Sequence, residues 1–314
     1  MNKVLVLGGS GFVGRHVCEQ LNRLGIRATV PTRRAVNARQ VQTLPMVDVL
    51  EANIHDASTL ERLVAGHDAV INLVAILHGS TRQFAAVHVK LPEMLAQAMH
   101  SQGVKRLVHV SALGASADAA SHYQRTKAQG EAVLQNSGLE LTILRPSVIF
   151  GAEDRFLNLF AKMQAVLPVV PLAGSGTRFQ PIWVGNVAEA VVKSLQQANT
   201  VGHTYECVGP DVFTLADLVR LSGKLSGHPR PVFGLPRAIA YFQALFMQIL
   251  PGEPLMSTDN LRSMEVDNVA TGQWPTQAQL GIVAQALPAE AARYLDLSGQ
   301  ADPLLAKRQM ASKR

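Results

Sequence analysis

Short runs of apolar residues recur through the first half of the chain. They predict β-strands at residues 3–7, 27–32, 47–53, 69–73, 106–110 and 141–144. Segments of helical length separate these runs. One of them places the following residues at helical spacing: Phe12, Val13, His16, Val17, Leu21 and Leu24. The alternation of strand and helix predicts an α/β fold with a doubly wound parallel sheet of the Rossmann type.

The pattern changes after residue 145, where prolines and glycines interrupt it. Further helices are predicted at 187–198, 214–226 and 236–250, with one short strand at 204–208. We therefore expect residues 1–145 and about 178–210 to form an NAD(P)-binding Rossmann domain. Residues 146–177 and 211–298 would form a smaller, mostly helical C-terminal lobe, and residues 299–314 a basic tail.

Composition narrows the class of protein. The 314 residues are 47% hydrophobic, which is enough for one large core with a smaller lobe packed on it. The two cysteines, Cys18 and Cys207, form neither a disulfide framework nor a metal-ligand pattern, so no metal is expected. The first apolar run is too short for a signal peptide, and no run reaches the roughly 20 residues of a membrane span, which predicts a cytoplasmic protein. Scattered basic residues and few aromatics disfavour nucleic-acid binding.

Three glycines follow the first predicted strand and open the first helix. Gly8, Gly11 and Gly14 are three residues apart. Without a Cβ the backbone can approach a pyrophosphate, whose charge then lies on the free N–H groups of the helix N-terminus. A purely structural turn is the alternative, but the strand–loop–helix placement favours a dinucleotide site. The contacts expected in this loop are Gly8, Ser10, Gly11, Phe12, Val13 and Gly14.

The choice of dinucleotide depends on the charge after the second strand. The chain has no acidic residue between Glu19 and Asp48, whereas Arg33 and Arg34 follow that strand. This charge suits a 2′-phosphate, so we expect NADP(H) in preference to NAD(H). Two solvated loop arginines are the alternative. Further cofactor contacts are expected after the third and fourth strands, from Asn53, Ile54, Val74 and Ala75.

Candidate catalytic residues lie farther along the chain. Tyr123 and Lys127 are four residues apart and so share one face of a helix. Ser111 follows the fifth strand, at the sheet edge where ligands of open α/β folds bind. In a reductase the phenol transfers a proton, the ammonium lowers the phenol pKa and holds the ribose, and the serine orients a carbonyl. Tyrosine and lysine at this spacing also occur by chance in helices.

With these motifs the chain resembles the short-chain dehydrogenase/reductase superfamily, in its extended or atypical, epimerase/dehydratase-like branch, over nearly its whole length. The resemblance rests on Gly8-x-x-Gly11-x-x-Gly14, Val110-Ser111-Ala112, Tyr123-x-x-x-Lys127 and residues 145–151. It implies Ser111, Tyr123 and Lys127 as catalytic residues, and Lys127, Pro146 and Val148 as cofactor contacts.

More narrowly, residues 109–115, 154–158 and 178–184 resemble the nucleotide-binding accessory subunit of respiratory complex I and its bacterial relatives. This similarity implies NADP(H) binding, in several members without known turnover, and a link of some relatives to ubiquinone synthesis. The chain departs from the superfamily pattern at Asn53, His88 and Asn186, where Asp, Asn and Asp are common. His88 would either relay protons near Lys127 or pack between helices.

Two functions follow as hypotheses. The first is an NADP(H)-dependent reductase or epimerase-like enzyme that acts on a carbonyl or quinone-related substrate. The second is a non-catalytic NADP(H)-bound accessory or assembly protein of a respiratory complex, at the inner face of a membrane. The apolar stretch 236–250 is either a buried helix or an exposed one that contacts a quinone, a lipid or a membrane protein. Its stripe consists of Ala238, Ile239, Phe242, Leu245, Phe246 and Ile249.

Overall fold

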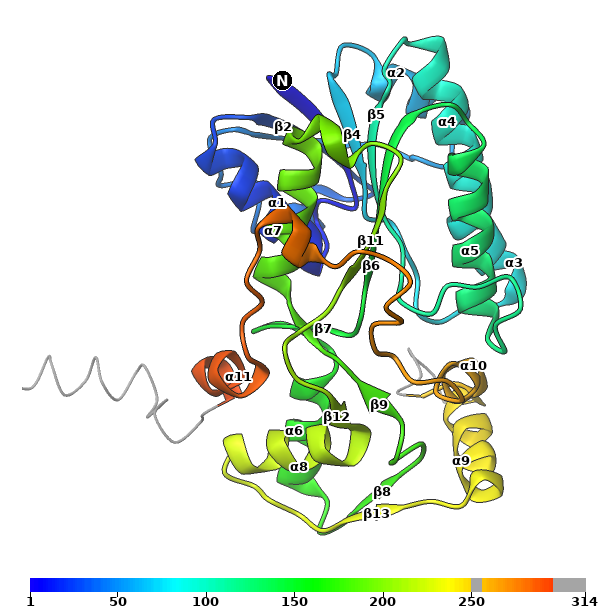
Figure 1. The fold of residues 1–314 in the computed structure, drawn as a ribbon, viewed down its shortest axis with the longest axis vertical. Helices are drawn as coiled ribbons and strands as arrows, with labels where there is room; N and C mark the ends of the chain where they lie inside the picture. The colour runs from blue at the N-terminus through cyan, green and yellow to red at the C-terminus, as the bar shows by residue number, and fades with distance from the viewer. Residues whose placement is uncertain (250–255, 296–314) are drawn as a thin grey trace, which may run out of the picture.

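A seven-stranded parallel sheet forms the centre of the molecule (Figure 1). The computed structural model describes residues 1–249 and 256–295, so the expected basic tail lies outside the described residues. The strands lie in the order β11-β6-β5-β4-β1-β2-β3, which confirms the predicted doubly wound α/β fold. Their bounds are β1 (Lys3–Leu7), β2 (Arg27–Thr32), β3 (Val47–Glu51), β4 (Ala69–Asn72), β5 (Arg106–Val110), β6 (Glu140–Pro146) and β11 (Thr204–Cys207).

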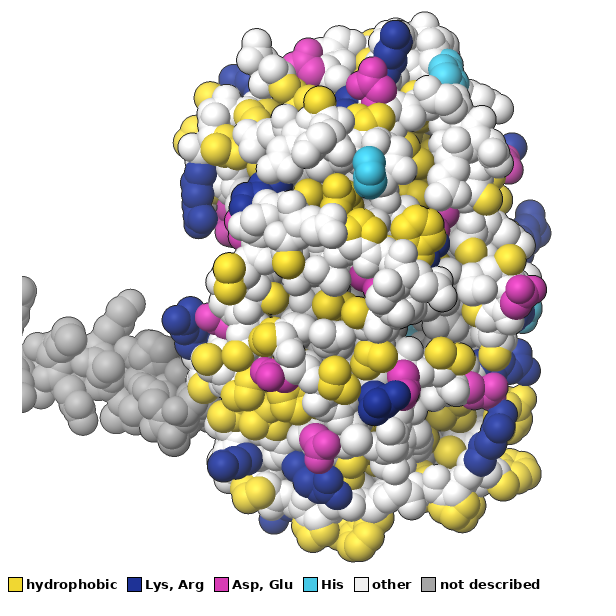
Figure 2. Space-filling model, viewed as in Figure 1, with side chains coloured by type: hydrophobic (Ala, Val, Ile, Leu, Met, Phe, Trp, Pro, Cys, Tyr) yellow, Lys and Arg dark blue, Asp and Glu magenta, His cyan; other side chains and the backbone are white. Residues whose placement is uncertain are grey.

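A smaller lobe lies beyond the carboxyl ends of these strands (Figure 1). Its helices are α6 (Leu157–Val166), α8 (Leu215–Leu225), α9 (Arg237–Ile249), α10 (Thr258–Ser263) and α11 (Leu287–Leu295). Three short strand pairs complete it: β7 (Ile149–Phe150) with β10 (Ile182–Trp183), β8 (Val170–Leu172) with β13 (Val232–Gly234), and β9 (Arg178–Phe179) with β12 (Phe213–Thr214). Figure 2 shows the two parts meeting along a continuous surface on the face in view.

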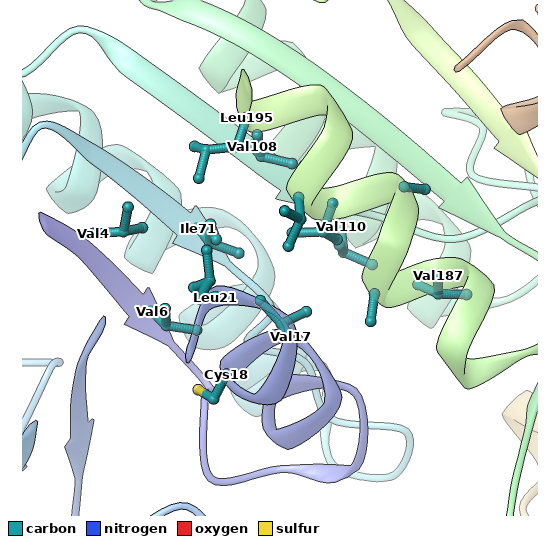
Figure 3. Packing of buried hydrophobic residues seen from close by; sticks show 14 of the residues in the cluster. Val4, Val6, Val17, Cys18, Leu21, Ile71, Val108, Val110, Val187 and Leu195 are labelled. Carbon is teal, nitrogen blue, oxygen red and sulfur yellow. The ribbon is translucent and has the colours of Figure 1, made fainter. Parts of the chain in front are cut away.

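Helices cover both faces of the central sheet. On one face, α1 (Phe12–Arg23) and α7 (Val184–Gln196) pack against each other and against Val4 and Val6 of β1 (Figure 3). On the other face, α2 (Ala57–Val64), α4 (Leu91–Ser101) and α5 (His122–Gln135) cover Leu5 and Leu7. This alternation along a fully buried strand is typical of a parallel sheet with helices on both sides. Among the described residues, no helix has both the length and the apolar character needed to cross a membrane.

The third strand is shorter than predicted. It ends at Glu51, opposite Thr32, and the N–H of Ala52 donates to the Thr32 carbonyl at 2.9 Å. Because β2 ends at Thr32, Asn53 has no strand to pair with and lies in the loop. The expectation that Asn53 ends the third strand is therefore wrong.

Candidate functional site

The loop between β1 and α1 has the backbone geometry of an anion site. Gly11 precedes the helix in extended conformation, with φ −83° and ψ 179°, and no side chain caps the helix. The first helical hydrogen bond runs from the Arg15 N–H to the Gly11 carbonyl at 3.1 Å. The N–H groups of Phe12, Val13 and Gly14 therefore have no hydrogen-bond acceptor within the helix. Such an N-terminus attracts a phosphate group.

The glycines of this loop have different roles. A Cβ on Gly14 would lie 2.2 Å from the Gly8 carbonyl oxygen, so Gly14 is required for α1 to pack on the loop. A Cβ on Gly11 would meet only that same oxygen, at 3.3 Å, and otherwise open space. Gly8 adopts a φ of +81°, which side chains rarely accept, and lies against the backbone of Leu73. This cradle of open backbone fits the pyrophosphate of a dinucleotide.

The loop after β2 carries the two arginines that the sequence indicates for cofactor choice. Arg33 and Arg34 are both exposed, and neither side chain forms an ion pair with a described residue. One carboxylate nearby was missed by the sequence analysis. Glu51 accepts a hydrogen bond from the N–H of Ala35 at 2.6 Å. The pairing of Glu51 with Thr32 across the sheet brings it there, although it lies outside the acid-free stretch.

The remaining expected cofactor contacts are spread over three loops. Asn53 is exposed, and its Oδ1 accepts a hydrogen bond from the His55 N–H at 3.1 Å, while Ile54 packs on the core beside α2. Val74 donates its N–H to Asn72 Oδ1 at 3.2 Å, and the exposed Ala75 follows it. The contact of Leu73 with Gly8 brings this segment beside the glycine loop. Pro146 is buried and Val148 is partly buried, at the end of β6.

Ser111 lies directly after β5 and is 5% exposed. Its N–H donates to the Leu144 carbonyl at 2.7 Å, which holds it to β6. Its Oγ is buried and has no hydrogen-bond partner among the described residues. Leaving a buried hydroxyl unpaired costs about 1–3 kcal/mol, so this hydroxyl has an unused hydrogen bond.

Lys127 joins α5 to the same strand end. Lys127 is 2% exposed, and its ammonium group donates a hydrogen bond to the Val110 carbonyl at 2.9 Å, one residue before Ser111. Burial lowers the pKa of Lys127 to about 8, and the Glu131 carboxylate opposes this shift. The ammonium retains two further N–H groups for a ribose or a phenol.

Tyr123 lies one helical turn before Lys127. Its ring contacts the rings of His88 and Phe84 edge-on, with centroids 5.4 and 6.2 Å away. Burial raises the pKa of the phenol to about 12, so its proton is retained at neutral pH. Lys127 thus reaches the carboxyl end of β5 beside Ser111, and Tyr123 lies one helical turn before Lys127 at the start of α5.

His88 supports this arrangement from a π-helical segment, Ala86–Lys90. It is 3% exposed, its Nδ1 lies 3.0 Å from Thr126 Oγ1, and its Nε2 accepts the N–H of Ile76 at 3.2 Å. Burial, with a smaller contribution from the Lys127 charge, lowers the pKa of His88 to about 3. The histidine is therefore neutral and donates from Nδ1. Of the two expected roles, these contacts match packing between helices.

Two residues of the C-terminal segment complete the site and were missed by the sequence analysis. Asn268 Oδ1 accepts hydrogen bonds from Ser147 Oγ and the Val148 N–H, and its Nδ2 donates to the Leu113 carbonyl. Asp259 of α10 accepts hydrogen bonds from the N–H groups of His122 and Tyr123. A Ser-x-x-Asn capping box at Ser257 marks the start of α10 in the sequence, but nothing local indicates that α10 contacts α5.

Residues 4–207 match the NAD dependent epimerase/dehydratase family. The chain belongs to this family. The subunit named NADH dehydrogenase (ubiquinone) 1 alpha subcomplex subunit 9, mitochondrial, from Mus musculus is 32% identical over 285 residues, which cover 88% of this chain and 75% of the mouse protein. The expected resemblance to the epimerase/dehydratase branch and to that subunit is thereby confirmed.

Two further proteins extend the comparison. Ceramide reductase of Caulobacter vibrioides is 29% identical over 191 residues, 60% of this chain and 59% of that protein. The crystal structure of dTDP-glucose 4,6-dehydratase from Streptomyces venezuelae with NAD bound has a TM-score of 0.74 at 19% identity, covering 95% of this chain and 97% of that one. At this identity the structural likeness shows the fold alone.

Proposed function

We propose that this family member is an NADP(H)-dependent oxidoreductase that reduces a carbonyl or quinone-related substrate, with Ser111, Tyr123 and Lys127 as its catalytic residues. The observation that carries the proposal is the buried, unpartnered hydroxyl of Ser111 at the strand end to which Lys127 is bonded. An epimerase-like reaction would use the same three side chains. The name of the ceramide reductase supports reduction among relatives.

The reaction follows from the chemistry of these groups. A dinucleotide held by the glycine loop would supply a hydride to the carbonyl carbon. Ser111 donates its unused hydroxyl hydrogen bond to the carbonyl oxygen and orients it. Tyr123, protonated at neutral pH, donates its proton to that oxygen as negative charge develops. The Lys127 ammonium stabilises the phenolate that remains and binds the ribose hydroxyls with its free N–H groups.

The preference for NADP(H) over NAD(H) is part of the proposal. The exposed Arg33 and Arg34 have no described ion-pair partner, so both guanidinium groups are free to bind a 2′-phosphate. Glu51 opposes them, but its Oε1 already accepts the Ala35 N–H. The two positive charges outnumber this single carboxylate.

A second candidate is a non-catalytic NADP(H)-bound accessory protein of a respiratory complex, at the inner face of a membrane. The observation that favours it is the bond of Lys127 to the Val110 carbonyl, together with the raised pKa of Tyr123. Burial causes that raised pKa, and the Lys127 charge does not lower it. The mouse subunit's name supports the same candidate.

Turnover separates the two candidates. NADPH consumption is measured with the purified chain and a panel of short-chain quinones, aldehydes and ketones. The reductase proposal predicts consumption with at least one member, and a loss of about 10²–10⁴-fold in Tyr123→Phe at unchanged NADPH affinity. Tyr241→Phe, on exposed α9, is the matched control and retains the wild-type rate. Tight NADPH binding without turnover on any substrate favours the accessory protein.

A further inference from the structure

Helix α9 has the opposite arrangement from an ordinary surface helix. Its small residues Ala240 and Ala244 are buried, at 3% and 0% exposure. Its large apolar residues point outward, with Ile239 54%, Phe242 72% and Leu245 46% exposed. A surface helix that served only the core would bury its large side chains instead. The core-helix alternative is therefore wrong for these three side chains; those of Phe246 and Ile249 lie outside the described residues.

The exposed apolar surface continues beyond the helix. Phe233 of β13, just before α9, is 58% exposed. Strand β13 pairs in parallel with β8, which places Phe233 opposite Pro171. The segment leading into β8 exposes Val166 and Val169. Figure 2 shows hydrophobic side chains gathered along this end of the molecule, where Figure 1 places β8, β13 and α9. Scattered apolar residues are common on surfaces, but this continuity is not.

The charged side chains in the segment that contains β13 and α9 are all positive. From residue 218 to residue 252 the sequence has no aspartate or glutamate, but it has Arg220, Lys224, Arg230 and Arg237. Arg220 and Arg237 pair with Asp217 and Glu265. Lys224 and Arg230 are exposed and form no ion pair with a described residue. Arg230 lies three residues before Phe233 in the sequence, so an unpaired positive charge adjoins this end of the apolar surface.

We propose that the α9 surface, formed by Phe233, Ile239, Tyr241, Phe242 and Leu245, docks on an anionic lipid bilayer with α9 lying in the interface. Helices that lie in the membrane interface typically have outward aromatic and aliphatic side chains beside basic residues. Lysine and arginine near the lipid headgroups add electrostatic attraction in anionic membranes. The inference rests on α9 and its surroundings and does not require the proposed reaction.

This docking face lies on the side of the candidate site. Helix α9 contacts α10, and α10 contacts α5 through the bonds from Asp259 to the start of that helix. Figure 1 shows α9, α10 and the start of α5 following one another along one side of the molecule. A bilayer against α9 would therefore lie near the end of α5 that carries Tyr123.

Co-sedimentation of the full chain with vesicles tests the proposal. We expect binding to vesicles of phosphatidylglycerol and phosphatidylcholine, weakening with added salt, and at least tenfold weaker binding to phosphatidylcholine alone. Phe242→Ser and Ile239→Ser should each weaken binding about tenfold or more. Val283→Ser removes an 85% exposed side chain elsewhere and should change nothing. Unchanged melting temperatures show that each variant is folded.

Several outcomes would overturn the proposal. Wild-type protein that stays in the supernatant with anionic vesicles excludes the lipid surface. Binding that survives both α9 variants places the contact elsewhere, such as the basic residues 307–314. Self-association of the wild type that Phe242→Ser abolishes, without lipid binding, assigns the surface to a second copy of the chain. NADPH binding, measured in parallel, reports on the cofactor site independently.

Discussion

The carboxylate of Asp259 accepts a hydrogen bond from the backbone N–H of Tyr123 at 3.0 Å, and from the neighbouring N–H of His122 at 2.6 Å. A residue of the C-terminal lobe thus caps the helix that carries the candidate acid. The Ser121 side chain caps the same helix by accepting the Gln124 N–H. The N-terminus of α5 is therefore positioned by two segments that are far apart in the sequence.

Removing this cap should affect the site as well as stability. Asp259→Ala is expected to lower the free energy of unfolding by about 1–2 kcal/mol, because two amides lose their acceptor. It should also reduce kcat with little change in KM for the cofactor. Thr214→Ala removes the side-chain cap of α8, outside the described site, and is the matched control. Equal effects of both variants on kcat would contradict a positioning role for Asp259.

The neutral state of His88 predicts a dependence of stability on pH. Its folded pKa, about 3, lies below the ordinary value of 6.5, so the unfolded chain binds more protons between these values. The contribution of His88 to the free energy of unfolding is fully present above pH 6.5 and decreases as the pH falls. Between pH 7 and pH 5 its contribution drops by about 2 kcal/mol. Urea unfolding of His88→Asn, compared with wild type, should show a correspondingly flatter profile; identical slopes would contradict the account.

The lowered pKa of Lys127, about 8, predicts a pH dependence of cofactor binding. Below pH 8 the Lys127 side chain is charged and can bind the ribose. Above pH 8 it is mostly neutral and must take up a proton before it binds the ribose as an ammonium group. NADPH affinity should therefore fall by up to about tenfold between pH 7 and pH 9. Lys127→Met should bind more weakly and without this dependence. Tyr123→Phe should retain it, because the phenol keeps its proton throughout this range. A profile that persists in Lys127→Met would refute the assignment.

The core elements were predictable from the sequence because their signals are local. The apolar runs locate β1 to β6 and β11, and helical spacing locates α1, α7, α8 and α9. The strands of two or three residues, such as β7 and β9, carry no such signal. They exist because distant segments pair, for example Ile149 with Ile182.

The site was predictable to the same extent. The glycine loop is recognised from its spacing and its place after the first strand. Ser111, Tyr123 and Lys127 are recognised from their spacing, the end of the fifth strand and the family resemblance. Asp259 and Asn268 contact residues about 120 or more positions away, and no periodicity in their own segment points to those partners. The packing role of the neutral His88 side chain likewise depends on its contacts with Thr126 and Ile76, which form only in the folded chain.

The two arginines after β2 predict selectivity between the dinucleotides. We expect NADPH to bind about 10–100-fold more tightly than NADH, because charge-assisted hydrogen bonds to a phosphate contribute about 1.5–3 kcal/mol. The Arg33→Ala, Arg34→Ala double variant should lose this preference. Arg39→Ala, an exposed arginine at the end of the 3₁₀ turn Ala35–Ala38, is the matched control and should keep it. Equal affinity of the wild type for both dinucleotides would refute the preference.

Calorimetric titration of NADPH into Gly11→Val tests the dinucleotide site most directly. The extended backbone of Gly11 suits valine, and the added Cβ meets only the Gly8 carbonyl oxygen, so the variant should fold and melt near the wild-type temperature. Its side chain would occupy the space above the α1 N-terminus. Gly14→Val, which clashes with the Gly8 carbonyl, should instead lower stability in the absence of any ligand. We predict that the wild type binds one NADPH and that folded Gly11→Val shows no binding heat. Equal NADPH binding by both proteins, or none by the wild type, would contradict the account.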